Sequence, residues 1–160
     1  MDDAIQNFLA YLHNTKNISR NTEVSYERDL KKMVHYLECQ GEDDICMVSS
    51  TNLNSYMMYL EKEHFAPSTI SRSVASIRAF FQYLYLEGIR AENPAEHLKA
   101  PKIQKKTPGI LSVEEVDLLL KQPDKVTTKG IRDRAMLALL YATGIRVSEL
   151  IHLIVKDVNL

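Results

Sequence analysis

The first ninety residues repeat one pattern, in which hydrophobic side chains recur at intervals of three and four positions. This spacing places them on one face of an α-helix. We expect four amphipathic helices: the first from residue 3 to about residue 16, the second from a cap at residue 19 or 21 to Gly41, the third from about residue 51, and the fourth from residue 67 to Gly88. Their apolar stripes comprise Ile5, Phe8, Leu9 and Leu12; Tyr26, Leu30, Met33 and Leu37; Leu53, Tyr56, Met57 and Leu60; and Ile70, Val74, Ile77 and Phe81. Short connections between four such helices predict a bundle with one shared core.

Polar residues mark where these helices begin. Either Ser19 or Asn21 can cap the second helix, and Thr51 can cap the third, because side-chain oxygens accept hydrogen bonds from the free N–H groups of a first turn. Glycine follows the second helix at position 41 and the fourth at position 88, where each is expected to end the helix.

The pattern changes after about residue 98. Prolines interrupt any helix and lysines lie between them, which predicts an extended basic linker over residues 99–111. Ser112 and Glu115 then form a capping box, the signature of a new helix. We therefore predict a helical domain over residues 1–98, the linker, and an incomplete second domain over residues 112–160.

The second domain contains residues 135–140, a run of strong helix formers that is apolar on every side, as is typical of a buried helix. Gly144 can end this helix in the left-handed conformation. Arg146 then begins a new turn in a position expected to be sheltered, with Glu149 on the same helical face. The pair is either structural, or Glu149 orients the planar guanidinium to bind phosphate or carboxylate oxygens.

Composition narrows the classes of protein. The chain has 160 residues, of which 45% are hydrophobic and 26% charged, as in globular proteins. No apolar run approaches the ~20 residues of a membrane span, and no signal-peptide pattern is present, so a cytoplasmic location is expected. Cys39 and Cys46 form no metal-binding motif, so no metal is predicted. The net charge of −1 conceals an asymmetry: residues 1–99 contain 10 basic and 14 acidic side chains, and residues 100–160 contain 10 and 7.

The segment from Ala142 to Leu150, Ala-Thr-Gly-Ile-Arg-Val-Ser-Glu-Leu, resembles the first catalytic-arginine box of the tyrosine recombinases, the phage integrase family. Residues 132–137 and 155–158 resemble Xer-type site-specific recombinases in particular. The resemblance covers essentially the whole chain. It implies a core-binding domain with a SAM-like four-helix bundle, then the first helices of a truncated mixed α/β catalytic domain, so the chain as given is expected to be all-α.

This resemblance implies an enzyme that cuts and rejoins DNA through a 3′ phosphotyrosine intermediate, without a cofactor, as a tetramer on a double-stranded recombination site. Such an enzyme would act in DNA integration or in chromosome partition during the cell cycle. Arg146 matches the first catalytic arginine and Glu149 its orienting partner. The family's His-x-x-Arg motif is absent from the 160 residues, and none of the eight tyrosines matches the nucleophile. The chain alone is therefore expected to bind DNA without cleaving it.

DNA contact is predicted for polar residues outside the apolar stripes. On the fourth helix, small polar side chains and arginines can enter a major groove, and the linker lysines can contact phosphates of any sequence. The resemblance adds the second helix. The predicted residues are Ser68, Thr69, Arg72 and Arg78; Lys105 and Lys106; and Asn21, Thr22 and Arg28. The alternative for each is a merely solvated position.

Two other functions fit the same sequence. One is a non-catalytic DNA-binding module or regulator derived from the family. The other is an all-helical protein interaction domain in which Arg146 and Glu149 form a structural pair. A salt-dependent affinity for DNA separates this last function from the others.

Overall fold

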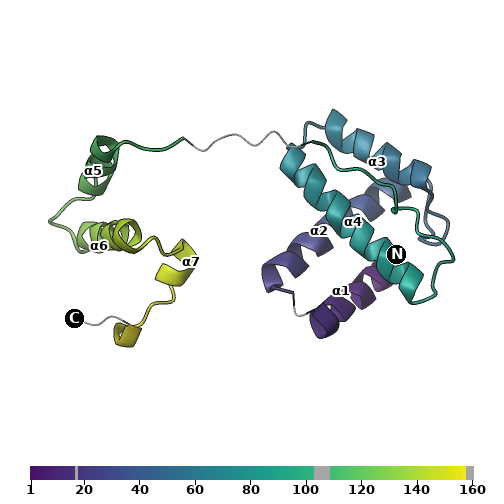
Figure 1. Ribbon diagram of the computed structural model, residues 1–160, viewed down its shortest axis with the longest axis horizontal. Coiled ribbons are helices and arrows are strands. Elements are labelled where there is room, and N and C mark those ends of the chain that lie inside the picture. Colours follow the sequence, from purple (N-terminus) through teal and green to yellow (C-terminus); the bar gives the residue numbers. More distant parts are fainter. Residues whose placement is uncertain (17, 103–108, 158–160) are drawn as a thin grey trace. The chain divides into compact units, whose positions relative to one another are not determined.

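A computed structural model describes residues 1–16, 18–102 and 109–157 of the chain. The chain divides into two compact units, residues 1–105 and 106–160, and each is built of helices (Figure 1). No strand occurs within these described ranges. The all-helical fold predicted from the sequence is therefore confirmed. The boundaries predicted at residues 98 and 112 stay a prediction, and the linker between them falls partly outside the described residues.

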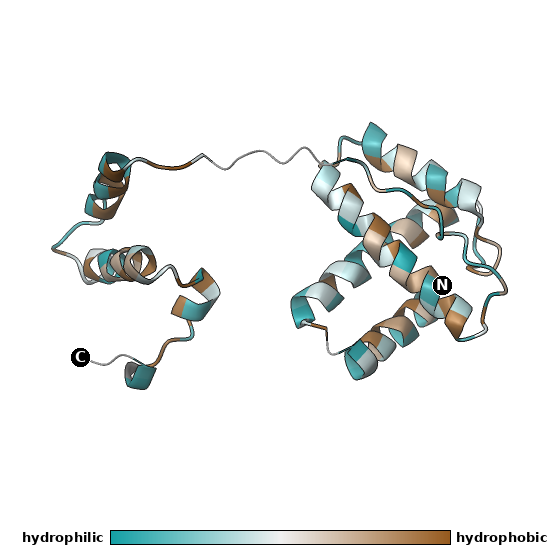
Figure 2. Cartoon of the chain, in the orientation of Figure 1, coloured by the Kyte–Doolittle hydropathy of each residue, from teal (hydrophilic) through white to brown (hydrophobic). Residues whose placement is uncertain are grey.

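Four helices make up the first unit. They are α1 (Asp2–Lys16), α2 (Arg20–Cys39), α3 (Ser50–Lys62) and α4 (Pro67–Leu86). The residues of the four predicted apolar stripes are buried, except Tyr26, which is half-buried. Figure 2 shows that each of these helices carries both hydrophobic and hydrophilic positions. The predicted four-helix bundle with one core is confirmed.

Helix α2 is central to this bundle, because it packs against α1, α3 and α4. Helices α1 and α4 also meet through aromatic side chains. The rings of Phe8 and Phe80 are fully buried and lie edge to face, with centroids 5.4 Å apart. This geometry is one that aromatic pairs prefer, and it adds to the free energy gained by burying both rings.

The structure shows which residues cap α2 and α3. Ser19 caps α2, because its Oγ accepts a hydrogen bond from the backbone N–H of Thr22 at 3.3 Å. The prediction that Thr51 caps α3 is wrong. The cap is Ser49, whose Oγ accepts from the N–H of Asn52, while Asn52 Oδ1 accepts from the N–H of Ser49 at 2.9 Å. These reciprocal bonds satisfy two free donors at once, which Thr51 alone does not offer.

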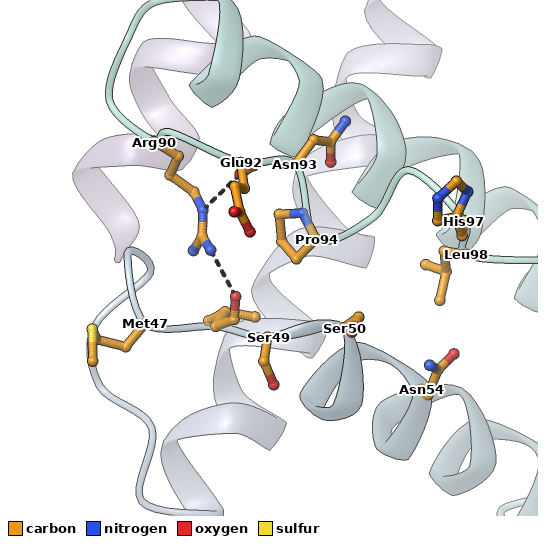
Figure 3. Close-up of a pocket in the computed structure, with 11 residues that line it drawn as sticks. Met47, Ser49, Ser50, Asn54, Arg90, Glu92, Asn93, Pro94, His97 and Leu98 are labelled. Carbon is orange, nitrogen blue, oxygen red and sulfur yellow. Dashed lines mark hydrogen bonds between the residues drawn. The ribbon is translucent and has the colours of Figure 1, made fainter.

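The segment after α4 is fastened to the loop before α3. The Arg90 guanidinium donates to the backbone carbonyl of Ile45. It also donates to the carbonyls of Val48 and Glu92, at 2.9 and 3.3 Å (Figure 3). Farther along, Ala95 and Leu98 are buried. A pocket of about 480 Å³ lies beside this contact. Its lining is Met47, Val48, Ser49, Ser50, Asn54, Arg90, Glu92, Asn93, Pro94, His97 and Leu98, a set that includes none of the predicted DNA-binding residues.

The second unit contains α5 (Val113–Lys121), α6 (Thr128–Thr143), α7 (Val147–Leu150) and a 3₁₀ turn (Val155–Asp157). Helix α5 begins with the predicted capping box, in which the N–H of Ser112 donates to Glu115 at 2.7 Å. The expectation that α6 is buried is wrong for this structure: within residues 135–140, Ala135 and Ala138 are exposed and the other four residues are half-buried. A helix that is apolar on every side needs neighbours on every side, and α6 packs only on α5 and α7 within the described residues.

Candidate nucleic-acid interface

Arg146 stands at the junction between α6 and α7. Gly144 ends α6 with a φ of 67°, the left-handed conformation that glycine adopts without steric cost. The chain then turns, and Arg146 takes the extended N-cap position of α7. This local geometry is the one that the sequence predicts, and it follows from Gly144.

Glu149 holds Arg146 through two hydrogen bonds. The backbone N–H of Arg146 donates to Oε2 at 2.7 Å, and its Nη1 donates to Oε1 at 3.2 Å. One carboxylate thus caps the first turn of α7 and orients the guanidinium. The expected shelter, however, is not present among the described residues. The side chains of Arg146 and Glu149 are 82% and 51% exposed.

An exposed guanidinium held at one nitrogen keeps most of its five N–H donors for another partner. Its planar fork matches two oxygens of a phosphate or a carboxylate. The arrangement at Arg146 can therefore receive an anion from solvent. An exposed ion pair contributes only about 0–1 kcal/mol to folding, so stability alone gives little reason for this geometry.

The predicted residues of α4 lie on its polar face but differ in environment. Ser68 and Arg78 are exposed, and Thr69 is half-buried. Arg72 is already engaged: its Nε donates to Asp29 Oδ2 at 2.8 Å, and its Nη2 donates to Oδ1 at 2.9 Å. The hydrogen bonds that Arg72 donates to the Asp29 carboxylate raise the pKa of Arg72 further above its already high ordinary value.

The sequence alone did not predict Asp29 as the partner of Arg72. Asp29 belongs to α2 and is 2% exposed, whereas the side chain of Arg72 is 37% exposed. The sequence did contain a signal, because Asp29 lies between Tyr26 and Met33 on the apolar side of α2. A carboxylate on a buried face requires a cationic or hydrogen-bonding partner. The sequence near Asp29 does not show which residue is that partner.

On α2, the predicted Asn21 and Arg28 are exposed, and Thr22 is half-buried. The Thr22 hydroxyl lies 2.9 Å from Ser19 Oγ, so this side chain belongs to the helix cap. Because α2 and α4 pack together and the Asp29–Arg72 pair joins them, their polar residues belong to one unit of structure. The predicted Lys105 and Lys106 lie outside the described residues.

Comparison with known proteins gives two family matches along the chain. Residues 5–88 match the phage integrase N-terminal SAM-like domain, and residues 110–160 match the phage integrase family. The chain belongs to the phage integrase family of tyrosine recombinases. The first match covers α2–α4 and α1 from Ile5 onward, and the second covers α5–α7 together with Arg146 and Glu149.

Individual members of this family are similar along the whole chain. Tyrosine recombinase XerD of Oceanobacillus iheyensis is 40% identical over 162 residues, which include 100% of this chain and 54% of the relative. Tyrosine recombinase XerC of Herpetosiphon aurantiacus is 39% identical over 163 residues, 100% of this chain and 53% of the relative. The chain thus spans about half the length of the curated relatives it matches. None of the helices in the described ranges is long and apolar enough to cross a membrane.

Proposed function

We propose that this chain is the DNA-binding portion of a Xer-like site-specific recombinase, together with the segment of the catalytic domain that supplies its first arginine. In this proposal, residues 1–98 form the core-binding domain, residues 99–111 a basic linker, and residues 112–160 the beginning of the catalytic domain. The complete protein cuts and rejoins double-stranded DNA through a 3′ phosphotyrosine intermediate, as a tetramer of protomers on its recombination site.

The observation that carries the proposal is the exposed Arg146 guanidinium beside Glu149, in a segment that matches the phage integrase family. Phosphoryl transfer to a tyrosine requires positive charge near the nonbridging oxygens of the attacked phosphate. A guanidinium oriented by a carboxylate supplies this charge in a fixed direction. Arg146 is therefore the proposed catalytic residue, and Glu149 the residue that positions it.

The polar surface of α2 and α4 is the proposed DNA-facing part of the first domain. Asn21, Arg28, Ser68 and Arg78 are solvent-accessible there, Thr22 and Thr69 are half-buried, and Arg72 is held at its edge. Lys105 and Lys106 add contacts to phosphates that do not depend on base sequence. Binding then combines groove contacts from the helices with charge from the linker.

The 160-residue chain is proposed to bind DNA but not to cut it. Arg146 can hold a phosphate, but the 160 residues contain no His-x-x-Arg motif to provide a second arginine. No tyrosine follows Arg146 either, since Tyr141 is the last in the sequence. Incubation with a nicked duplex should give no covalent protein–DNA product. A covalent product would contradict this inventory of catalytic groups.

Binding to a double-stranded DNA fragment at increasing salt tests the proposal. The logarithm of the affinity should fall linearly with the logarithm of salt concentration, and Lys105→Ala with Lys106→Ala should reduce the slope by about 0.9 per lost phosphate contact. The matched control is Lys121→Ala with Lys125→Ala, which removes the same charge from positions not predicted to contact DNA. An unaltered chain with no salt-dependent affinity would favour a protein interaction domain instead.

A further inference from the structure

The ion pair between Asp29 and Arg72 is the most specific polar contact between α2 and α4. Two parallel hydrogen bonds of 2.8 and 2.9 Å join the Nε and Nη2 edge of the guanidinium to both carboxylate oxygens. This bidentate geometry fixes both the position and the rotation of the guanidinium plane. The residues are 43 positions apart, so the contact exists only because the two helices pack together.

The two partners are buried unequally. Asp29 is 2% exposed, but the side chain of Arg72 remains 37% exposed. A guanidinium has five N–H donors, and Asp29 occupies two of them. The other three are on Nη1 and Nη2, and within the described part of the chain they have no hydrogen-bond acceptor. The edge that carries one N–H from each of these nitrogens is therefore left for an external acceptor.

The surroundings of Arg72 on α4 leave room for such an acceptor. Ser68, one turn before Arg72, and Ala75, almost one turn after it, are both exposed and have short side chains. Arg28 of α2, next in sequence to Asp29, is exposed as well. A large polyanion can approach Arg72 closely across these small residues. The approach is favoured by α4, which carries Arg72 and Arg78 and no acidic residue.

Stability alone explains this pair poorly. The cost of removing a buried carboxylate from water often cancels the attraction of its partner, and apolar replacements of such pairs are often at least as stable. In a binding site, the side chains that contact the ligand must be held in place by neighbouring residues, even where those residues add little to stability. Asp29 meets that requirement for Arg72.

We propose that Asp29 is a positioning residue that holds Arg72 so that the free guanidinium edge donates two parallel N–H groups to duplex DNA. The acceptor is a pair of oxygen or nitrogen atoms, either O6 and N7 of a guanine or two oxygens of a phosphate. This inference rests on the proposed DNA-facing role of α4. It adds that a buried residue of α2 sets the geometry of contact.

A double-mutant cycle measures this coupling. Affinity for a random-sequence duplex pool is measured for the unaltered chain, Asp29→Asn, Arg72→Ala and the double variant. Arg72→Ala should weaken binding about tenfold, and Asp29→Asn by roughly fivefold, within the range expected for a bidentate contact. In the Arg72→Ala background, Asp29→Asn should change affinity less than about twofold, because the group that it positions is gone.

Further variants separate positioning from folding. Arg72→Lys keeps a charge for Asp29 but cannot present two parallel donors, so it should fold and still lose most of the affinity. Arg78→Ala is the matched control, because it removes an exposed arginine from the same helix. The loss of DNA affinity that it causes should be the same with and without Asp29→Asn. Thermal unfolding of every variant shows whether a loss of affinity follows a loss of structure.

Sequencing the bound DNA distinguishes the two acceptors. Loss of a guanine preference in Arg72→Ala identifies a base contact, whereas an unchanged preference with a smaller salt slope identifies a phosphate. Asp29→Asn that weakens binding equally with and without Arg72, or that lowers stability without changing affinity, would overturn the positioning role. If the unaltered chain does not bind duplex DNA at all, the proposed function fails and this inference fails with it.

Discussion

At the scale of single residues, Arg146 combines a fixed direction with free access to solvent. Its backbone and its guanidinium bond to the same carboxylate, so rotation of the side chain is limited at one end. The rest of the guanidinium faces outward. Limited rotation together with solvent exposure suits an arginine that binds an anion better than an arginine that only stabilises α7.

The first prediction at this scale concerns Arg146→Lys in a complete recombinase that contains these 160 residues. Lysine keeps the charge but loses the planar fork that contacts two phosphate oxygens. Cleavage of a nicked half-site should fall by roughly 10²–10³-fold, the usual effect of removing one group that stabilises transition-state charge. Single-turnover formation of the covalent product measures this rate.

Two comparisons complete that experiment. DNA affinity of the Arg146→Lys variant should stay within about twofold of the original, because most phosphate contacts are proposed to come from the linker and the first domain. Glu149→Gln should lose less activity, since glutamine keeps an oxygen acceptor for the Arg146 N–H. Normal cleavage by the Arg146→Lys variant would contradict a catalytic role for Arg146 and would show that the Arg146–Glu149 pair is structural.

At the scale of elements, the Arg90 side chain fastens the segment after α4 to the loop before α3. Arg90 satisfies carbonyls of the loop before α3, and the same segment buries Ala95 and Leu98. The path of the chain as it leaves the bundle is therefore fixed against α3 up to Leu98. The predicted basic linker, residues 99–111, begins directly after this attached segment.

Arg90→Ala should consequently loosen the end of the first unit. Leaving the carbonyls of Ile45 and Val48 without a donor should cost about 2 kcal/mol, since hydrogen bonds from charged groups are worth more than neutral ones. For a domain of this size that corresponds to a fall of roughly 10 °C in Tm. Differential scanning calorimetry checks the value. Arg78→Ala is the control, and equal midpoints for the two variants would show that Arg90 does not hold the segment.

At the scale of the whole molecule, the chain consists of two units that differ in how well they cover their apolar side chains. The first has a continuous core shared by four helices. In the second, Leu150 is the one buried hydrophobic residue within the described ranges. The first unit therefore has the features of an independently stable domain, and the second depends more on its surroundings.

Limited proteolysis tests this difference. Trypsin should cut between Lys99 and Lys106, where the sequence predicts an extended lysine-rich segment, and leave a resistant fragment that begins at Met1. Peptides from residues 112–160 should appear next, because few apolar contacts oppose local opening there. Mass spectrometry of the products over time gives the order. Uniform resistance along the chain would argue against two units.

The sequence by itself determined the features that depend on neighbouring residues. The apolar stripes predicted the four helices and their buried faces, since helical periodicity is local to each segment. Ser112 and Gly144 predicted a helix start and a helix end through the backbone groups beside them. The box around Arg146 predicted the family, because its signature is a short run of adjacent residues.

Only the tertiary structure decided which distant residues meet and which remain exposed. It paired Asp29 with Arg72 and Arg90 with the carbonyls of Ile45 and Val48, contacts across more than forty positions. It also left α6 and Arg146 exposed where the sequence predicted burial. Periodicity shows which face of a helix is apolar, but whether that face is covered depends on the other helices that pack against it.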